Sequence, residues 1–284
     1  MLNLKITEIM KAQANFMAID CETANHQQSI CQIGMVVVRE GKIVEKLEYL
    51  VQPPYNKYDP MSSRIHGITS EHTKNSPPFP EVWNAIKGYF RNETLVAHNG
   101  KSADFNYLRK ELNKHQLDHP LFYALIDTMD FFGTYKLEEL CQFYNIEFEN
   151  RHNSLKDAEA CAKLFLKRFD QDVILPTKKS MNLCLAKAKD QQQKNLNALI
   201  ENADPNNIFF EKGVLFTGFI GADRDFVKKE LLKRGAIIKS GVTRNVDIFI
   251  KGDEPGPSKM KKLKDLQDKG FDILVLEKDE FYDK

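Results

Sequence analysis

Two carboxylates, Asp20 and Glu22, stand one residue apart at the end of the apolar run 16–19. If this run is a β-strand, side chains at positions i and i+2 point to the same face of the sheet, so the two acids converge. Carboxylate oxygens arranged in this way suit hard divalent cations such as Mg²⁺. Because a motif this short also occurs by chance, the alternative is a solvated strand end. A metal site therefore needs further ligands from elsewhere in the chain.

Three later segments offer such groups. Asp104 follows the apolar run 94–97 and His98-Asn99, which places an acid at the start of a helix just beyond a strand. His152 is followed five positions later by Asp157, and the strand-like segment 124–128 ends in an acid and a threonine. A histidine has an ordinary pKa near 6.5, so it can take a proton from water near neutral pH. Taken alone, His152 reads as a surface loop histidine.

The order and spacing of these residues resemble the DEDDh 3′–5′ exonucleases, which include the proofreading epsilon subunit of bacterial replicases, ribonuclease T and oligoribonuclease. The resemblance covers roughly residues 16–169 and includes the segment 66–69, His-Gly-Ile-Thr. It implies a ribonuclease H-like fold and His152 as the general base. It also implies four metal ligands, namely Asp20, Glu22, Asp104 and Asp157. The tyrosine-using relatives place their tyrosine where this chain has Asn153, so the histidine type is favoured.

The chemistry of phosphodiester hydrolysis agrees with this set. Two divalent ions about 3.5–4 Å apart supply a nucleophilic hydroxide and offset the charge on the leaving oxygen. Four acidic side chains balance the charge of two such ions, and Mg²⁺ usually keeps several waters for the reaction. We therefore predict two Mg²⁺ or Mn²⁺ ions as cofactors.

The resemblance also implies substrate contacts and contains two departures. Thr23, His66 and Asn99 would contact the terminal nucleotides. Where the family often has Thr-Thr-Gly after its first two acids, this chain has Thr-Ala-Asn at 23–25, so the preference for a terminal base and sugar stays open. The segment before Asp104 is one residue longer than usual and carries Ala103 in place of an aromatic residue. We expect a bulged helix entry there.

The C-terminal segment resembles a BRCT domain of the type found in bacterial NAD-dependent DNA ligases and the large subunit of eukaryotic clamp loaders. The resemblance rests on Val-Leu-Phe-Thr-Gly at 214–218, Leu-Lys-Arg-Gly-Ala at 232–236 and Asp-Ile-Phe-Ile at 247–250. It implies a phosphate site formed by Thr217, Gly218 and Lys259, with Arg224 as a fourth contact. A hydroxyl, a backbone amide and cations near a helix N-terminus hold anions well. The alternative is a tight turn beside a solvated lysine face.

The pattern of apolar residues predicts two α/β domains joined by a helix. Three antiparallel strands, at 16–19, 32–38 and 42–51, precede strand–helix alternation, which indicates a mixed sheet with strands at 94–98 and 124–128 and helices at 81–90, 104–114, 137–144 and 154–169. Further on, strands at 213–216, 236–239, 247–250 and 272–276 alternate with helices at 224–234 and 258–269, which indicates a small parallel sheet. We predict an exonuclease domain at 1–175, an exposed helical linker at 176–207 and a BRCT domain at 208–284.

The composition indicates the cell compartment in which the protein is expected to act. The five cysteines are odd in number and form no Cys-x-x-Cys pair, so they read as reduced, mostly buried thiols. Residues 1–14 alternate apolar and polar side chains, unlike a signal peptide. No run approaches the roughly 18 apolar residues of a membrane span. We expect a cytoplasmic protein without membrane contact.

The leading hypothesis is an exonuclease that degrades single-stranded 3′ ends of DNA and releases 5′-mononucleotides. The BRCT domain would bring it to 5′-phosphorylated DNA ends or to a replication or repair protein. DNA is favoured over RNA only through the BRCT resemblance, so trimming of RNA or short oligonucleotides is the second hypothesis. The third is a non-catalytic binding protein with a degenerate nuclease domain, which the altered segment before Asp104 keeps open.

Overall fold

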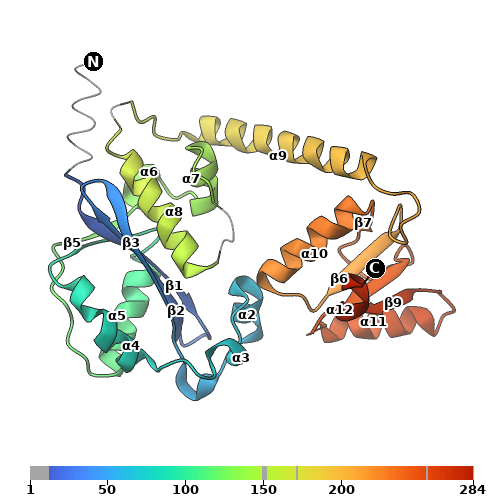
Figure 1. The fold of residues 1–284 in the computed structure, drawn as a ribbon, viewed down its shortest axis with the longest axis horizontal. Helices are drawn as coiled ribbons and strands as arrows, with labels where there is room; N and C mark the ends of the chain where they lie inside the picture. Colours follow the sequence, from blue (N-terminus) through green and yellow to red (C-terminus); the bar gives the residue numbers. More distant parts are fainter. Residues whose placement is uncertain (1–12, 149–151, 171, 254, 284) are drawn as a thin grey trace. The chain divides into compact units, whose positions relative to one another are not determined.

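The computed structural model describes residues 13–148, 152–170, 172–253 and 255–283 (Figure 1). The chain divides into two compact units, residues 1–186 and 187–284. Residues 1–12, which carry most of the prediction that no signal peptide is present, lie outside the described residues. Within the described residues, no helix is long and apolar enough to cross a membrane.

The N-terminal unit is built on a five-stranded sheet in the order β3-β2-β1-β4-β5. Strands β1 and β2 pair antiparallel, as do β2 and β3, whereas β4 lies parallel to both β1 and β5. The predicted mixed sheet is therefore confirmed. The bounds are β1 Phe16–Thr23, β2 Ile30–Arg39, β3 Lys42–Leu50, β4 Thr94–Ala97 and β5 Ala124–Asp127.

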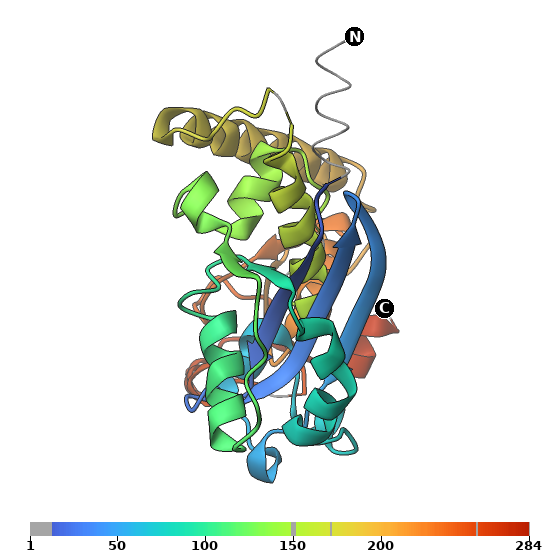
Figure 2. The ribbon, with the colours of Figure 1, turned by 90° about the vertical axis from the view of Figure 1, so that its left-hand side faces the viewer.

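Helices cover both faces of this sheet (Figures 1 and 2). Helix α8, Ser154–Lys167, packs on the face that carries Phe16 and Ala18. Helices α4, Phe79–Ile86, and α5, Asp104–Lys114, contribute to the cluster that buries the alternate residues of β1. That cluster includes Cys21, which is 8% exposed, so its predicted place in the core is confirmed. The period of two along β1 thus fixes which residues face α8.

Several short helices were not predicted. They are α2 Pro60–His66, α3 Ser70–Thr73 and α6 Met129–Phe132, with the 3₁₀ turn η1 Pro54–Asn56, whereas the 3₁₀ turn η2, Lys87–Phe90, lies within a predicted helix. The predicted helix at 81–90 is split into α4 and η2, whereas α5 has the predicted bounds and α7 spans Leu137–Phe143. Helices of one or two turns lack a full apolar stripe, and tertiary packing stabilises them more than their own sequence does.

Helix α9, Lys178–Glu201, lies in the predicted linker, and most of its described side chains are exposed as expected, with an exception in its first turn. Met181 in its first turn is 1% exposed and packs with Phe132, Leu140 and Leu164 of the N-terminal unit. Leu185, one turn later, packs against the same cluster, so two apolar side chains dock the start of the helix, although the surrounding sequence is polar.

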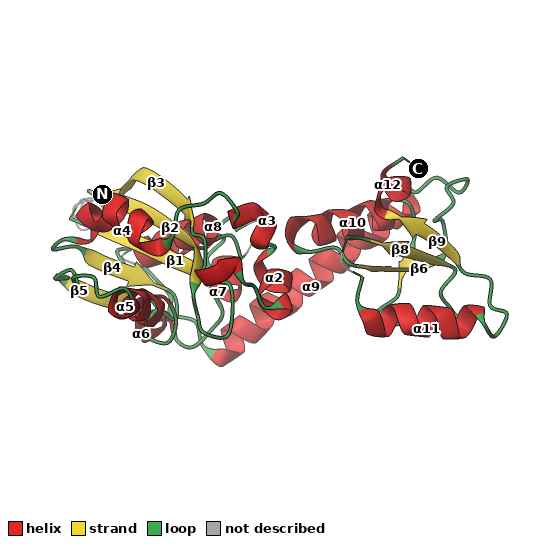
Figure 3. Cartoon of the chain, turned by 90° about the horizontal axis from the view of Figure 1, so that it is seen from below, coloured by secondary structure: helices red, strands yellow, loops and turns green. Residues whose placement is uncertain are grey.

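The C-terminal unit contains an all-parallel sheet in the order β7-β6-β8-β9, as predicted (Figure 3). Phe216 packs with Val227 of α10 on one face, and Leu215 packs with Leu263 of α11 on the other. The last helix, α12, was not predicted, and its Phe281 is fully buried in the first of these clusters. The bounds are β6 Gly213–Thr217, α10 Gly221–Lys233, β7 Ile237–Ile238, β8 Ile248–Lys251, α11 Pro257–Gln267, β9 Leu274–Glu277 and α12 Lys278–Tyr282.

Candidate active site

Asp20 and Glu22 lie within β1 and not at its end, because the strand continues to Thr23. The pairing with β2 extends as far as Thr23 opposite Ile30, with an irregularity between Glu22 and Thr23. By the alternation of the strand, both acids share the face of Ala18, which is covered by α8. The two carboxylates therefore share one face of β1 as predicted, and the strand extends to Thr23, beyond the predicted run 16–19.

The start of α8 brings two predicted site residues to this face. Potential ligand atoms of Glu22, His152 and Asp157 all lie within 4.8 Å of one another. Asp157 sits in the first turn of α8 and is 9% exposed, and its Oδ2 accepts a hydrogen bond from the backbone N–H of His152 at 3.2 Å. His152 is exposed and has a φ of 65°, a left-handed backbone that non-glycine residues rarely adopt.

Polar side chains of β2 and β3 fasten this end of α8, and the sequence did not single them out. Gln32 Oε1 accepts the backbone N–H of Ser154 at 3.1 Å, and Gln32 Nε2 donates to Glu48 Oε1 at 3.1 Å. The same Glu48 oxygen accepts from Nδ2 of Asn153 at 2.8 Å, while Asn153 Oδ1 caps the helix at Lys156 N. The signal in the sequence was a glutamine inside the apolar run of β2.

Asp104 reaches the site despite the altered segment before it. It is the first residue of α5, is 2% exposed, and its Oδ1 accepts the backbone N–H of Cys21 at 2.8 Å. Because Cys21 stands between Asp20 and Glu22, this bond holds Asp104 against the middle of the acidic pair. All five residues predicted for metal binding and catalysis are thus gathered around the C-terminal half of β1.

The concentration of negative charge changes the acidity of the site. Burial, followed by the charges of Asp157 and Asp104, raises the pKa of Glu22 to about 8. Burial raises the pKa of Asp104 to about 7, although the hydrogen bond from Cys21 opposes the shift. The pKa of Asp20 lies well above its ordinary value because of burial and the charges of Asp104, Asp157 and Glu22. A set of carboxylate oxygens that repel one another, with one imidazole, fits hard divalent cations.

The residues predicted to contact substrate lie in two places. His66 ends α2, and its Nε2 donates to the backbone carbonyl of Thr23 at 3.2 Å, next to Glu22. Burial lowers the pKa of His66 to about 4, so its imidazole is neutral. Asn99 is exposed just beyond β4 and has a φ of 61°. The structure thus places His66 and Thr23 together beside the acidic pair, with Asn99 in the loop that leads to Asp104.

Comparison with known proteins identifies the family. Residues 17–165, more than half of the chain, match the protein family described as Exonuclease. The chain belongs to this exonuclease family. The matched region spans the five-stranded sheet and the whole of the site above, so residues 1–186 are called the exonuclease unit below.

Two curated relatives and one solved structure illustrate the similarity of the exonuclease unit. The DNA polymerase III PolC-type of Caldanaerobacter subterraneus subsp. tengcongensis is 27% identical over 172 residues, covering 56% of this chain and 12% of that protein. The 3′-5′ exonuclease DinG of Staphylococcus epidermidis is 26% identical over 211 residues, covering 69% and 23%. The chain thus spans less than a quarter of either relative. The crystal structure of cell-death related nuclease 4 aligns with 13% identity and a TM-score of 0.49, covering 57% of this chain and 65% of that one.

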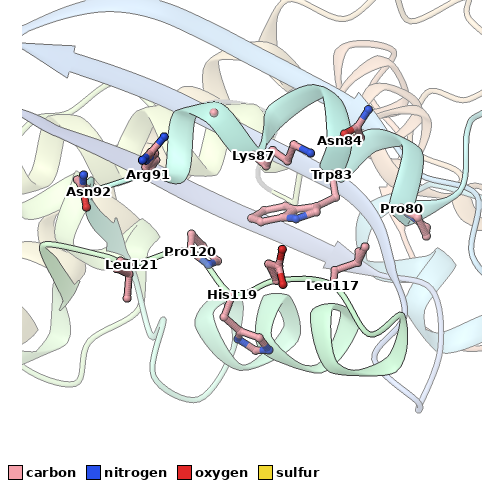
Figure 4. Close-up of a pocket in the computed structure, with 12 residues that line it drawn as sticks. Pro80, Trp83, Asn84, Lys87, Arg91, Asn92, Leu117, His119, Pro120 and Leu121 are labelled. Atoms are coloured by element: carbon pink, nitrogen blue, oxygen red, sulfur yellow. The ribbon is translucent and has the colours of Figure 1, made fainter.

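A separate pocket of the exonuclease unit contains none of the predicted site residues (Figure 4). It has a volume of about 650 Å³ and lies between α4 with η2 and the segment 117–121. Trp83 faces it, with Lys87 and Arg91 along the helix (Figure 4). Its Asn92 precedes β4, whereas Asn99 and Asp104 follow that strand, so the pocket and the acidic site are at opposite ends of β4.

In the C-terminal unit, the predicted phosphate-binding residues lie at the end of β6, in α10 and in the first turn of α11. Thr217 is 6% exposed, and its Oγ1 accepts the N–H of Gly256, just before α11, at 3.5 Å. Gly218 has a φ of 88°, and Lys259 lies in the first turn of α11. Arg224 is exposed, with its guanidinium carbon 5.5 Å from the centre of the Phe216 ring. The structure therefore brings Thr217 to the N-terminus of α11 and places Arg224 on α10.

Proposed function

We propose that the exonuclease unit is a DEDDh-type, metal-dependent 3′–5′ exonuclease that releases 5′-mononucleotides from the 3′ end of DNA. The observation that carries this proposal is the meeting of Glu22, His152 and Asp157 within 4.8 Å, beside the buried carboxylate of Asp104. A histidine among four acids is the donor set expected for metal-assisted hydrolysis, whereas a degenerate nuclease would be expected to lack one of these groups.

The residues divide the chemistry between them. Asp20, Glu22, Asp104 and Asp157 would hold two divalent cations, Mg²⁺ or Mn²⁺. When bound, such ions supply a nucleophilic hydroxide and offset the charge of the leaving oxygen. His152 would accept the proton of the attacking water as the water oxygen bonds to phosphorus and the bond to the 3′ oxygen breaks. Thr23, His66 and Asn99 would orient the terminal nucleotide.

DNA is the proposed substrate, and RNA is the second candidate. The chain is similar to DNA polymerase III PolC-type, whose name favours DNA, and to the 3′-5′ exonuclease DinG. We place the activity in the cytoplasm, because all five cysteines are free thiols and four of them are buried.

For residues 208–284 we propose a BRCT domain that binds 5′-phosphorylated DNA ends or a replication or repair protein. Its support is the parallel sheet together with the contact of Thr217 with Gly256 at the start of α11. Gly218, Lys259 and Arg224 would complete the phosphate contacts. The proposed limits of the nuclease domain and the helical linker are 1–175 and 176–207, with the first turn of α9 docked on the exonuclease unit through Met181.

The decisive experiment measures nucleotide release from matched single-stranded DNA and RNA oligomers, with Mg²⁺, Mn²⁺ or EDTA. We expect metal-dependent release of 5′-mononucleotides from the 3′ end. His152→Ala should lower turnover about 10²- to 10⁴-fold, the usual contribution of a general base, and Asp20→Asn should abolish it.

His119→Ala is the matched control, because this exposed histidine lines the separate pocket. A folded wild-type protein without metal-dependent release would refute the enzymatic proposal, and faster release from RNA would select the second substrate.

A further inference from the structure

We propose that Asp127 is a positioning residue that fixes the loop carrying Asp104, so that the longer segment before this acid still delivers its carboxylate to the site. The inference rests on the proposed function, because Asp104 matters to catalysis only if the unit is a metal-dependent nuclease. Asp127 ends β5, the strand next to β4, and its side chain is 3% exposed.

The Asp127 carboxylate accepts hydrogen bonds from three backbone amides. Its Oδ1 accepts from Asn99 N at 2.9 Å and from Met129 N at 3.0 Å, and its Oδ2 accepts from Lys101 N at 3.1 Å. Two of these amides belong to the loop between β4 and α5, and the third starts the turn into α6. A buried carboxylate is stable only when such hydrogen bonds replace its hydration, so the loop and the acid depend on each other.

The loop itself is tightly wound. Asn99 has a φ of 61°, and its carbonyl accepts from the amides of Ser102 and Ala103. A Cβ on Gly100 would lie 2.6 Å from Cβ of Ala97, which leaves room only for glycine. A left-handed residue and a close approach of this kind persist only where the surroundings hold them. The additional residue is thus taken up in a compact turn, and α5 still begins at Asp104.

The same loop makes a second contact, the ion pair of Lys101 with Asp130, which is exposed whereas Asp127 is buried. Lys101 Nζ lies 2.7 Å from Oδ2 of Asp130, but the two side chains are 61% and 48% exposed. An exposed ion pair of this kind contributes little, about 0–1 kcal/mol. Removing a buried acceptor leaves a backbone amide without a hydrogen-bond partner, which lowers the free energy of unfolding by more than the loss of an exposed ion pair. Asp130 therefore provides a matched control for Asp127, because it contacts the same loop through the same type of side chain.

The test compares Asp127→Asn with Asp130→Asn in the full chain. Asparagine keeps the shape of aspartate, but its NH₂ group would face one of the amides that now donate to the carboxylate. We expect Asp127→Asn to weaken Mn²⁺ binding, measured by calorimetry without substrate, about 10- to 100-fold, the range for groups that orient metal ligands. We expect kcat to fall by a similar factor while KM for a short oligomer changes less than twofold. Asp130→Asn should match the wild type in all three values.

Thermal unfolding verifies that Asp127→Asn is folded. If it is not, Gly100→Ala replaces it, because the added methyl group displaces the same loop while Asp127 stays intact. Wild-type Mn²⁺ affinity and kcat in a folded Asp127→Asn variant would overturn the inference. Asp104→Asn separates this failure from failure of the proposed function. If Asp127→Asn behaves like the wild type, the wild type is active and Asp104→Asn is inactive, then only the role of Asp127 is refuted. An inactive wild type refutes the proposed nuclease function itself.

Discussion

His98 shows how a single buried side chain joins the strand ends beside the site. Its Nε2 lies 3.0 Å from the carbonyl oxygen of Tyr135, which can only accept, so Nε2 carries the proton. Its Nδ1 therefore accepts from the hydroxyl of Thr128 at 2.7 Å. Thr128 follows Asp127, and His98 precedes Asn99, so this neutral imidazole reinforces the attachment of the loop before Asp104.

This geometry predicts a pH dependence of stability. Burial lowers the pKa of His98, although the Tyr135 carbonyl and the charge of Asp127 oppose the shift. In the unfolded chain the pKa returns to about 6.5, so below that pH the unfolded state binds more protons and the free energy of unfolding falls. The loss from one histidine is at most about 1.4 kcal/mol per pH unit. Urea unfolding at pH 8 and pH 5.5 should show a larger decrease for the wild type than for His98→Gln, and other titrating groups are common to both proteins. Equal decreases would contradict the assigned protonation state.

At the scale of elements, the site depends on how closely α8 approaches β2. A Cβ on Gly34 of β2 would lie 2.2 Å from the backbone carbon of Ser154 and 2.3 Å from the nitrogen of Leu155. Both contacts are with backbone atoms, which a rotamer change cannot relieve. Gly34 thus permits the approach that places Asp157, in the same first turn of α8, beside Glu22.

Gly34→Ala should therefore push the start of α8 away from the sheet. We expect a loss of about 1–3 kcal/mol in the free energy of unfolding, the usual cost of overpacking, together with a fall in kcat of at least tenfold. Gly88→Ala is the matched control, because no atom lies within 4 Å of the Cβ it would add in η2. The control should stay within about 1 kcal/mol of the wild type and keep its activity. Normal activity in Gly34→Ala would show that α8 tolerates displacement.

Some features of the helices and strands could be predicted from the sequence, and others could not. Helix α5 was predicted with its bounds because an acid at its start and an amphipathic pattern mark a helix locally. Helix α2 was not, since it has seven residues and follows a proline-rich loop. The convergence of Asp20 and Glu22 follows from strand alternation alone. The roles of Gln32, Glu48 and Asp127 depend on which backbone and side-chain amides the fold turns toward them, and no local pattern contains that information.

At the scale of the whole chain, the two units have hydrophobic clusters of their own. The largest cluster of the exonuclease unit packs β1 and β2 against α4 and α5, and the largest cluster of the C-terminal unit packs β6 and β8 against α10 and α12. The five proposed catalytic residues belong to the first unit and the proposed phosphate contacts to the second. A substitution in one unit should therefore leave the task of the other unchanged.

Thr217→Val in the full chain tests this separation. Valine keeps the shape of the buried threonine but removes the hydroxyl beside Gly256, and a hydrogen bond to a charged group contributes about 1.5–3 kcal/mol. We expect affinity for a 5′-phosphorylated duplex to fall about tenfold or more, while hydrolysis of a short single-stranded oligomer is unchanged. The same duplex without its phosphate, and the exposed Thr243→Val, serve as controls. Equal affinity of Thr217→Val and the wild type for the phosphorylated end would rule out phosphate binding at Thr217. It would leave a protein partner as the proposed ligand of the C-terminal unit.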